Sequence, residues 1–179
     1  MPENAAALLT PWSSFYVMTG SAAAGLTGLM FVVISLVTGW ERGANRDGIS
    51  TFSTPTVMHF GAALLVSAIL VAPWHSLVIA GVCVALVGLL GVIYVVRVTY
   101  RARRLRTYTP DFEDWTWYNV LPFLAYGALL GGAIALAIAP AQALFAIACG
   151  AIVLIFIGIR NAWDIVTYLA VADSPTSSK

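Results

Sequence analysis

The stretch TVMHFGAALLVSAILVAPWHSLVIAGVCVALVGLLGVIYVV, residues 56–96, contains no Asp, Glu, Lys or Arg. A membrane-spanning helix needs about 20 apolar residues, and one unbroken helix over residues 60–96 would be about 55 Å long, far beyond a hydrocarbon core of about 30 Å. The turn Ala72-Pro73-Trp74-His75 is the only break in the stretch. The sequence therefore predicts two antiparallel membrane-spanning helices joined by a tight turn.

The rest of the chain has the same apolar character. Its 179 residues are 60% hydrophobic and 9% charged, whereas soluble domains carry roughly a quarter charged residues. Apolar alternation typical of β-strands is missing. We predict an all-α, polytopic transmembrane helical bundle that forms one domain over residues 1–179. Its five spans are 15–40, 56–73, 76–96, 120–139 and 142–159, the last extending as a cytoplasmic helix to about residue 172.

Prolines indicate where helices begin and turn. Thr10-Pro11 and Thr54-Pro55 each place a hydroxyl before a proline, which is typical of the first turn of a helix. They predict the starts of the first and second spans. Ala139-Pro140-Ala141-Gln142 interrupts the last apolar stretch and predicts a second hairpin turn.

All the cations fall on one side of the predicted bundle. The N-terminal tail and the two proline turns contain none, and the other loops and the C-terminus contain all nine: Arg42, Arg46, Arg97, Arg101, Arg103, Arg104, Arg106, Arg160 and Lys179. Cations in short loops favour the cytoplasmic side. The N-terminus is therefore predicted outside and the C-terminus in the cytoplasm. Four spans would put Arg160 and Lys179 opposite the main cluster, so the asymmetry also favours five.

The two hairpins can be aligned with each other. Within one or two residues of a constant offset, the matches are Gly61 with Gly127, Pro73 with Pro140, Cys83 with Cys149, and Val98-Thr99-Tyr100 with Val166-Thr167-Tyr168. A duplicated two-span unit would produce a pseudo-twofold axis along the membrane normal, with the first span as an added element. The alternative is coincidence, because Gly, Pro and Val are common in any membrane hairpin.

Small residues recur every four positions on two spans. They are Gly20, Ala24 and Gly28 on the first span, and Gly127, Gly131, Ala135 and Ala139 on the fourth. Such ridges let membrane helices approach closely. Each ridge is expected to pack either within the protomer or between subunits, and the second alternative implies self-association.

A second pattern on the first span repeats every seven residues: Ser14, Ser21, Gly28 and Ser35. At two turns per seven residues these positions form one narrow stripe. The stripe either lines a polar pathway between several copies of the span, or its hydroxyls bond to carbonyls one turn earlier and leave a small packing face.

Groups that carry catalysis or bind metals are scarce. His59 is expected about one turn from the cytoplasmic end of the second span and His75 in an outer turn, too far apart for a joint metal site. The spans lack carboxylates, and Cys83 and Cys149 are isolated in apolar runs. No zinc-protease, phosphate-loop or nucleophile-elbow motif occurs. We predict no metal, no cofactor, no nucleic-acid partner and no enzymatic activity.

The remaining polar groups gather at the predicted cytoplasmic interface. Arg97, Arg101, Arg103, Arg104 and Arg106 are candidates to contact an anion or an anionic lipid headgroup, although cations there also serve orientation alone. After the last span, Arg160, Asn161 and Asp164 form a polar cluster, in which Arg160 and Asp164 pair if the helix continues. Trp115, Trp117 and Tyr118 fit the aromatic belt of a membrane interface.

Three short motifs are Phe15-Tyr16-Val17 through Gly20-Ser21, Asp114-Trp115 before Leu121-Pro122, and Arg160-Asn161-Ala162-Trp163-Asp164. In these motifs the chain resembles small bacterial inner-membrane proteins of uncharacterised function. The resemblance covers most of the chain and implies a bacterial cytoplasmic membrane. It implies no activity and no site residue.

Two functions fit these features. The first is a homo-oligomeric channel or passive transport pathway for small ions or solutes, in which several copies surround a route. The second is a non-conducting membrane scaffold or accessory subunit that binds a partner protein or anionic lipid. Both place the chain in the lipid bilayer, and the first requires self-association.

Overall fold

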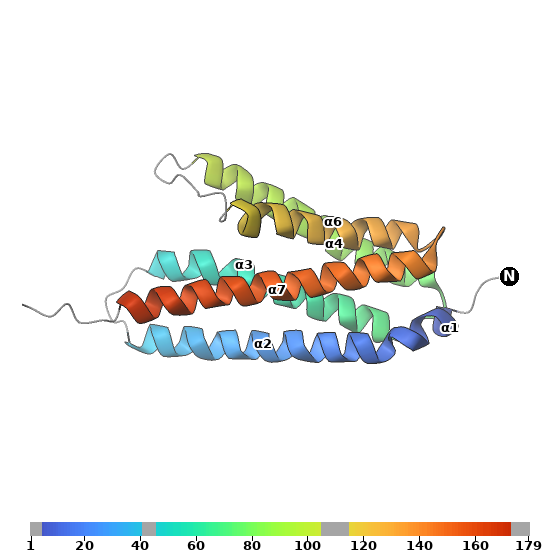
Figure 1. Ribbon diagram of the computed structural model, residues 1–179, viewed down its shortest axis with the longest axis horizontal. Coiled ribbons are helices and arrows are strands. Elements are labelled where there is room, and N and C mark those ends of the chain that lie inside the picture. Colours follow the sequence, from blue (N-terminus) through green and yellow to red (C-terminus); the bar gives the residue numbers. More distant parts are fainter. Residues whose placement is uncertain (1–4, 41–45, 105–114, 173–179) are drawn as a thin grey trace, which may run out of the picture.

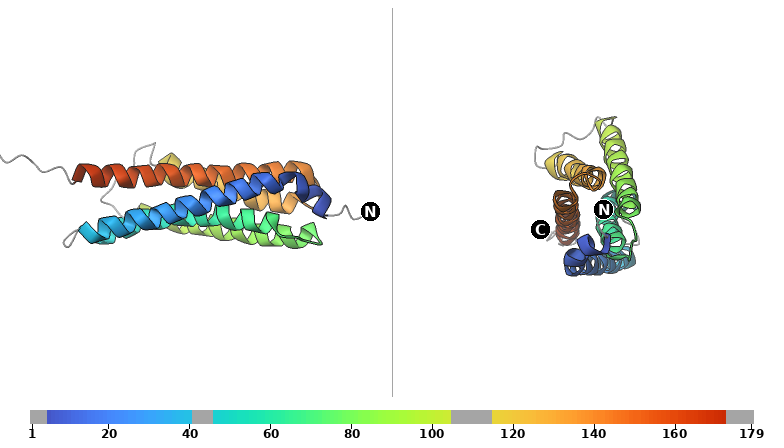
Figure 2. Two further views of the ribbon diagram at one scale, coloured as in Figure 1. Left: turned by 90° about the horizontal axis from the view of Figure 1, so that it is seen from below. Right: turned by 90° about the vertical axis from the view of Figure 1, so that its right-hand side faces the viewer.

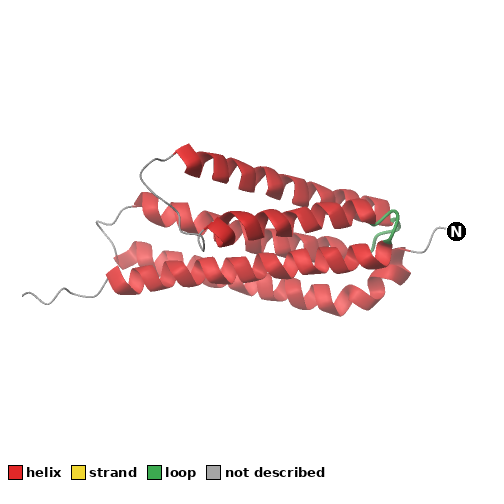
Figure 3. Ribbon diagram, turned by 45° about the horizontal axis from the view of Figure 1, so that its top comes forward, coloured by secondary structure: helices red, strands yellow, loops and turns green. Residues whose placement is uncertain are grey.

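The computed structural model describes residues 5–40, 46–104 and 115–172, and every regular element in these ranges is a helix (Figure 3). At the N-terminal end, α1 (Ala5–Leu9) and η1 (Thr10–Trp12) lead into α2 (Ser13–Trp40). The elements that follow are α3 (Arg46–Val71), α4 (Leu77–Arg104), the short π-helical η2 (Thr116–Val120), α6 (Leu121–Ala135) and α7 (Pro140–Ala172). The predicted all-α class is therefore confirmed.

The five long helices lie roughly along one axis and alternate in direction (Figure 1). The turns from α3 to α4 and from α6 to α7 lie at the end where α1 is found. The C-terminal ends of α2, α4 and α7 lie at the other end of the bundle. We call this the arginine-rich end, and its members within the described helices are Arg46, Arg97, Arg101, Arg103, Arg104 and Arg160.

Four helical segments are long and apolar enough to cross a membrane: Ala7–Ser35, Leu77–Tyr100, Thr116–Ala135 and Pro140–Asp164. The apolar part of α3, Pro55–Val71, is shorter. At 1.5 Å per residue it extends about 26 Å, near the lower limit for a span. Since α3 lies beside α2 and α7 in the bundle, the architecture is that of a multi-pass helical membrane protein.

Two helices extend further toward the arginine-rich end than predicted. Helix α3 begins at Arg46 rather than near residue 56, and α4 ends at Arg104 rather than near residue 96. Pro55 consequently lies inside α3, so the expectation that it stands in the first turn of the helix is wrong, although the apolar part of α3 does begin there. Membrane helices tolerate an internal proline because neighbouring groups can satisfy the carbonyl that it frees.

Packing within the bundle is uneven, because some helix pairs contact each other along much of their length and others hardly at all. Helix α6 packs along both α7 and α4, and α3 packs along α2 and α7, whereas α3 and α4 touch only sparsely (Figure 2). Helix α2 reaches α7 through Tyr16, which is fully buried and donates a hydrogen bond to the Leu144 carbonyl at 3.3 Å. The turn-linked helices α3 and α4 are therefore held together mainly through their other neighbours.

Two close glycine–aromatic contacts occur at matching positions of the two hairpins. A Cβ atom at Gly91 of α4 would overlap the Tyr126 ring of α6, and one at Gly158 of α7 would overlap the Phe60 ring of α3. Phe60 and Tyr126 are 66 residues apart, and Gly91 and Gly158 are 67 apart, which are the offsets of the sequence alignment. This is the arrangement that a pseudo-twofold axis would produce. The hairpins still differ, because α6 and α7 pack closely and α3 and α4 do not.

The predicted small-residue ridges contact the bundle only in part. Gly20 packs closely on α3, since a Cβ there would lie 3.0 Å from Ser67 Cβ. Gly127 and Gly131 do not pack closely on another described helix, because their added Cβ atoms would meet nothing within 4 Å, and Ala24 and Gly28 are exposed. Helix α6 instead turns the neighbouring Gly132 toward Ile147 of α7, and Ala135 is half-buried.

Candidate functional site

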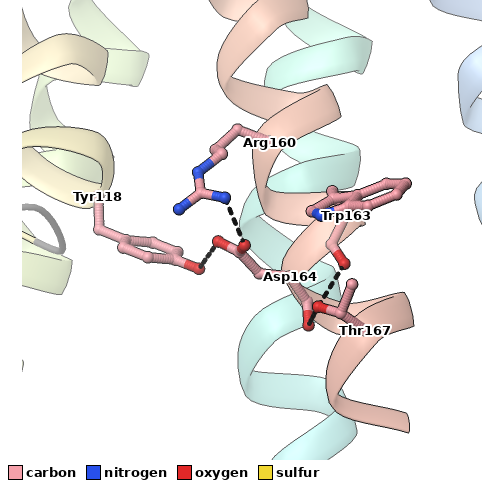
Figure 4. A network of polar contacts seen from close by, with 5 residues as sticks. All are labelled: Tyr118, Arg160, Trp163, Asp164 and Thr167. Carbon is pink, nitrogen blue, oxygen red and sulfur yellow. Dashed lines mark hydrogen bonds and ion pairs between the residues drawn. The ribbon is translucent and has the colours of Figure 1, made fainter. Parts of the chain in front are cut away.

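A polar network lies at the arginine-rich end, where α7 continues past its apolar part (Figure 4). Arg160 Nη1 lies 3.0 Å from Asp164 Oδ1 one turn later, so the sequence spacing does produce the expected ion pair. The hydroxyl of Tyr118 in η2 donates to Asp164 Oδ2 at 3.4 Å. The network thus ties α7 to η2, although about a third of each ion-pair side chain is exposed.

Neighbouring groups extend the network along α7. The Thr167 hydroxyl donates to the carbonyls of Trp163 at 2.9 Å and Asp164 at 3.1 Å (Figure 4). The Arg160 guanidinium lies 6.0 Å from the centre of the Trp117 ring, at the outer limit of a cation–π contact. Because exposed ion pairs contribute only about 0.2–1 kcal/mol each, this network orients α7 and η2 more than it stabilises the fold.

Asn161 faces the opposite way, into the bundle. It is 1% exposed, and neither its amide nitrogen nor its amide oxygen has a hydrogen-bond partner among the residues that the structure describes. It follows Gly158 by three residues, so it lies on the side of α7 that faces α3, about one turn closer to the arginine-rich end. A buried amide left without partners is destabilising by about 1–3 kcal/mol.

His59 is buried between helices, which the sequence did not predict. It is 3% exposed, and its Nδ1 atom is hydrogen-bonded to the hydroxyl of Tyr126, which is 2% exposed, at 3.0 Å. The sequence placed His59 about one turn from the end of the second span, which agrees with the start of the apolar part of α3 at Pro55, but it did not indicate that the imidazole is buried against α6. An ionisable group inside a membrane bundle is rare and is a candidate for function by default.

A groove opens between α4 and the start of α6 at the same end. It has a volume of about 390 Å³. Inside it, the Thr99 hydroxyl donates to the side-chain oxygen of Asn119 at 2.5 Å. This pair is the main polar feature among otherwise apolar and aromatic walls, lined by Val95, Val96, Thr99, Tyr100, Trp115, Asn119, Val120, Phe123 and Leu124.

The predicted arginine cluster is only partly within the described structure. Arg97 is exposed on α4. The backbone positions of Arg101, Arg103 and Arg104 belong to the last turn of α4, and Arg106 lies outside the described residues. The last turn of α4 therefore lies just past the apolar segment Leu77–Tyr100, next to the end of the groove.

The seven-residue stripe on α2 faces outward. Ser14, Ser21, Gly28 and Ser35 are all exposed, and an added Cβ at Gly28 would meet nothing within 4 Å. The Ser35 hydroxyl donates to the Phe31 carbonyl one turn earlier at 2.7 Å. The stripe is therefore a narrow, small face that no other described helix covers.

Within the described ranges, no three His, Cys, Asp or Glu side chains are grouped so that they could hold a metal ion. Cys83 is half-buried and Cys149 is exposed, both as free thiols. No protein-family model, curated protein or solved structure matches this chain.

Proposed function

We propose that this chain is a non-conducting membrane scaffold subunit that assembles with a second copy of itself through the outward face of α2. The observation that supports this proposal is that this face of α2 carries small residues and is covered by no other described helix. Ser14, Ser21, Gly28 and Ser35 share it with Met18, Gly25 and Val32, and all seven are exposed.

The spacing of the seven residues supports helix pairing. From Ser14 to Ser35 the steps alternate between four and three residues, which is the a and d pattern of a left-handed helix pair. Small residues at one of the two positions allow close backbone contact, which drives helix association in lipid. A second copy of α2 would cover the face along its whole length.

The packed interior of the protomer supports a non-conducting role. Several glycines of α4, α6 and α7 sit where even a Cβ atom would collide with a neighbour, such as Gly88 against the Leu130 backbone at 2.7 Å. Large side chains, including Phe60, Leu129 and Leu154, are fully buried between the helices. Any route for solutes would therefore have to run between copies.

The second candidate function is such a route, a homo-oligomeric pathway for small ions or solutes. It is favoured by the outward position of three serines on α2. Against it, the Ser35 hydroxyl is bonded to its own helix, so it offers passing solutes less than its position suggests. For either role we place the chain in a bacterial cytoplasmic membrane, with its N-terminus outside and the arginine-rich end in the cytoplasm.

The test compares substitutions on two exposed glycine positions. Gly28→Leu enlarges the α2 face, and Gly131→Leu makes the same change on α6, where an added Cβ also meets nothing within 4 Å. In mild detergent, native mass spectrometry should show dimers for the original chain and for Gly131→Leu, and at least tenfold fewer for Gly28→Leu. A monomeric original chain would overturn the assembly. Ion flux through liposomes that is lost in Gly28→Leu would favour the pathway instead.

A further inference from the structure

The groove at the arginine-rich end faces the surroundings of the bundle rather than its core. Helix α4 diverges from α6 toward this end (Figures 1 and 3), and three residues of the groove walls are about half exposed: Val96 at 51%, Phe123 at 47% and Leu124 at 59%. Its volume of about 390 Å³ lies within the range of roughly 300–1,000 Å³ for small-ligand sites. In a membrane, the molecules that meet such a surface are lipids.

The lining changes character along the groove. Val96, Phe123 and Leu124 form an apolar wall, and Thr99, Tyr100 and Asn119 lie nearer the end of α4 or the start of α6. Asn119 accepts a hydrogen bond from Thr99 through its carbonyl oxygen, and its amide N–H groups are donors of the kind that lipid ester carbonyls accept. The apolar wall is at the level of the acyl chains of a lipid, and the Thr99–Asn119 pair is at the level of its glycerol esters. The aromatic side chain of Tyr100 is at the level of the headgroup.

Positive charge continues this order beyond the groove. Arg103 follows Thr99 by four residues and Val96 by seven, so its position is on the groove line of α4, one turn closer to the helix end. Arg101 lies on nearly the opposite side of the helix. Residues 97–104 of α4 contain four arginines and no acid. The charge complements an anionic headgroup.

We propose that this groove binds one anionic diacyl glycerophospholipid. An acyl chain lies along Val96, Phe123 and Leu124, the ester region meets the Thr99–Asn119 pair, and the phosphate lies at the level of Arg103. A zwitterionic lipid has the same chains but adds a cation that the arginines repel. The site is independent of the proposed assembly, because it lies between α4 and α6 whereas the assembly face is on α2.

The experiment measures lipid retention by native mass spectrometry of the full chain in detergent, with phosphatidylglycerol and phosphatidylcholine of identical acyl chains. We expect one phosphatidylglycerol to be retained at least about fivefold better than phosphatidylcholine. Arg103→Gln should lower its retention about fivefold, and Arg101→Gln, two residues away with the same charge change, should leave it within about twofold. Equal losses in both variants would mean diffuse attraction by surface charge and would overturn the site.

A groove-filling variant tests the apolar part separately. Leu124→Trp should reduce retention of both lipids, while the thermal unfolding midpoint of the lipid-free protein stays unchanged because Leu124 is largely exposed. Retention that survives Leu124→Trp would show that lipid binds elsewhere, or that a segment of the chain itself occupies the groove, and would overturn the proposal. Neither result bears on dimers formed through α2.

Discussion

The Nδ1 atom of His59 lies 3.0 Å from the phenolic oxygen of Tyr126 and links α3 to α6, two helices that are not principal packing neighbours. The two rings are tilted with their centres 5.7 Å apart. Tyr126 also packs over Gly91 of α4, so a single aromatic side chain connects three helices. The contact adds a direct link between α3 and α6 to the more extensive packing of α4 on α6 and of α3 on α7.

Removing one partner of this hydrogen bond should therefore destabilise the protein. For Tyr126→Phe we expect the free energy of unfolding to fall by about 1 kcal/mol, because buried His59 loses its partner while the ring contacts remain. The measurement is unfolding in mixed micelles of increasing denaturing detergent. The double variant His59→Phe with Tyr126→Phe leaves no polar group unpaired and should recover part of the loss. A double variant that loses the sum of the two single losses would contradict the coupling.

Replacing a closely packed glycine and replacing a glycine without a close neighbour should change the free energy of unfolding in different directions. Gly88→Ala should lower the free energy of unfolding by about 1–3 kcal/mol, because the new Cβ would lie 2.7 Å from the backbone nitrogen of Leu130. Gly127→Ala, on α6, meets nothing within 4 Å and should be neutral or stabilising by up to about 1 kcal/mol, as alanine favours helix. Similar losses for both variants in the same unfolding assay would contradict the packing of α4 on α6.

Replacing Asn161 and replacing Asn119 should change the stability of the protein in opposite directions. Asn161→Leu should raise the free energy of unfolding by about 1–3 kcal/mol, because the buried amide has no hydrogen-bond partner among the described residues. Asn119→Leu removes the bond from Thr99 and should lower it by about 1 kcal/mol. A loss of stability in Asn161→Leu would mean that its amide does bind a group in the assembled protein, and would make it a functional candidate.

The sequence was informative about spans because their signals are local. Proline turns, and the end of the bundle at which each arginine lies, can be predicted without knowing how the helices pack. Helix α7 ends at Ala172, directly before the polar sequence Asp173-Ser174-Pro175. The face that each helix presents is different, since these helices are apolar on all sides. Gly131 and Gly132 are adjacent, yet only Gly132 meets a neighbour, Ile147 of α7. Which of these two glycines packs against α7 depends on the shape of side chains far along the chain.

The same reasoning explains why the His59 site was missed. The segment before Pro55 is polar and has the composition of a loop, so the helix start at Arg46 was hidden. Tyr126, the partner of His59, lies 67 residues later on another helix, and no local pattern indicates their contact. The Arg160–Asp164 pair was predictable because it depends only on spacing within one helix. Tyr118, which completes that network from η2, depends on tertiary packing and had no sequence signal.

Orientation in the membrane gives the last prediction. The odd number of long helices puts the α3–α4 turn and the C-terminal part of α7 at opposite ends of the bundle. In a chain whose Cys83 and Cys149 are replaced, His75→Cys lies at an exposed position in that turn and Val166→Cys at an exposed position near the end of α7. A membrane-impermeant thiol reagent should label position 75 in intact cells and position 166 only after the membrane is opened, because cations favour the cytoplasmic side. The reverse pattern would invert the orientation and put the arginine-rich groove on the outer leaflet, whereas labelling of both positions in intact cells would contradict the five-helix crossing itself.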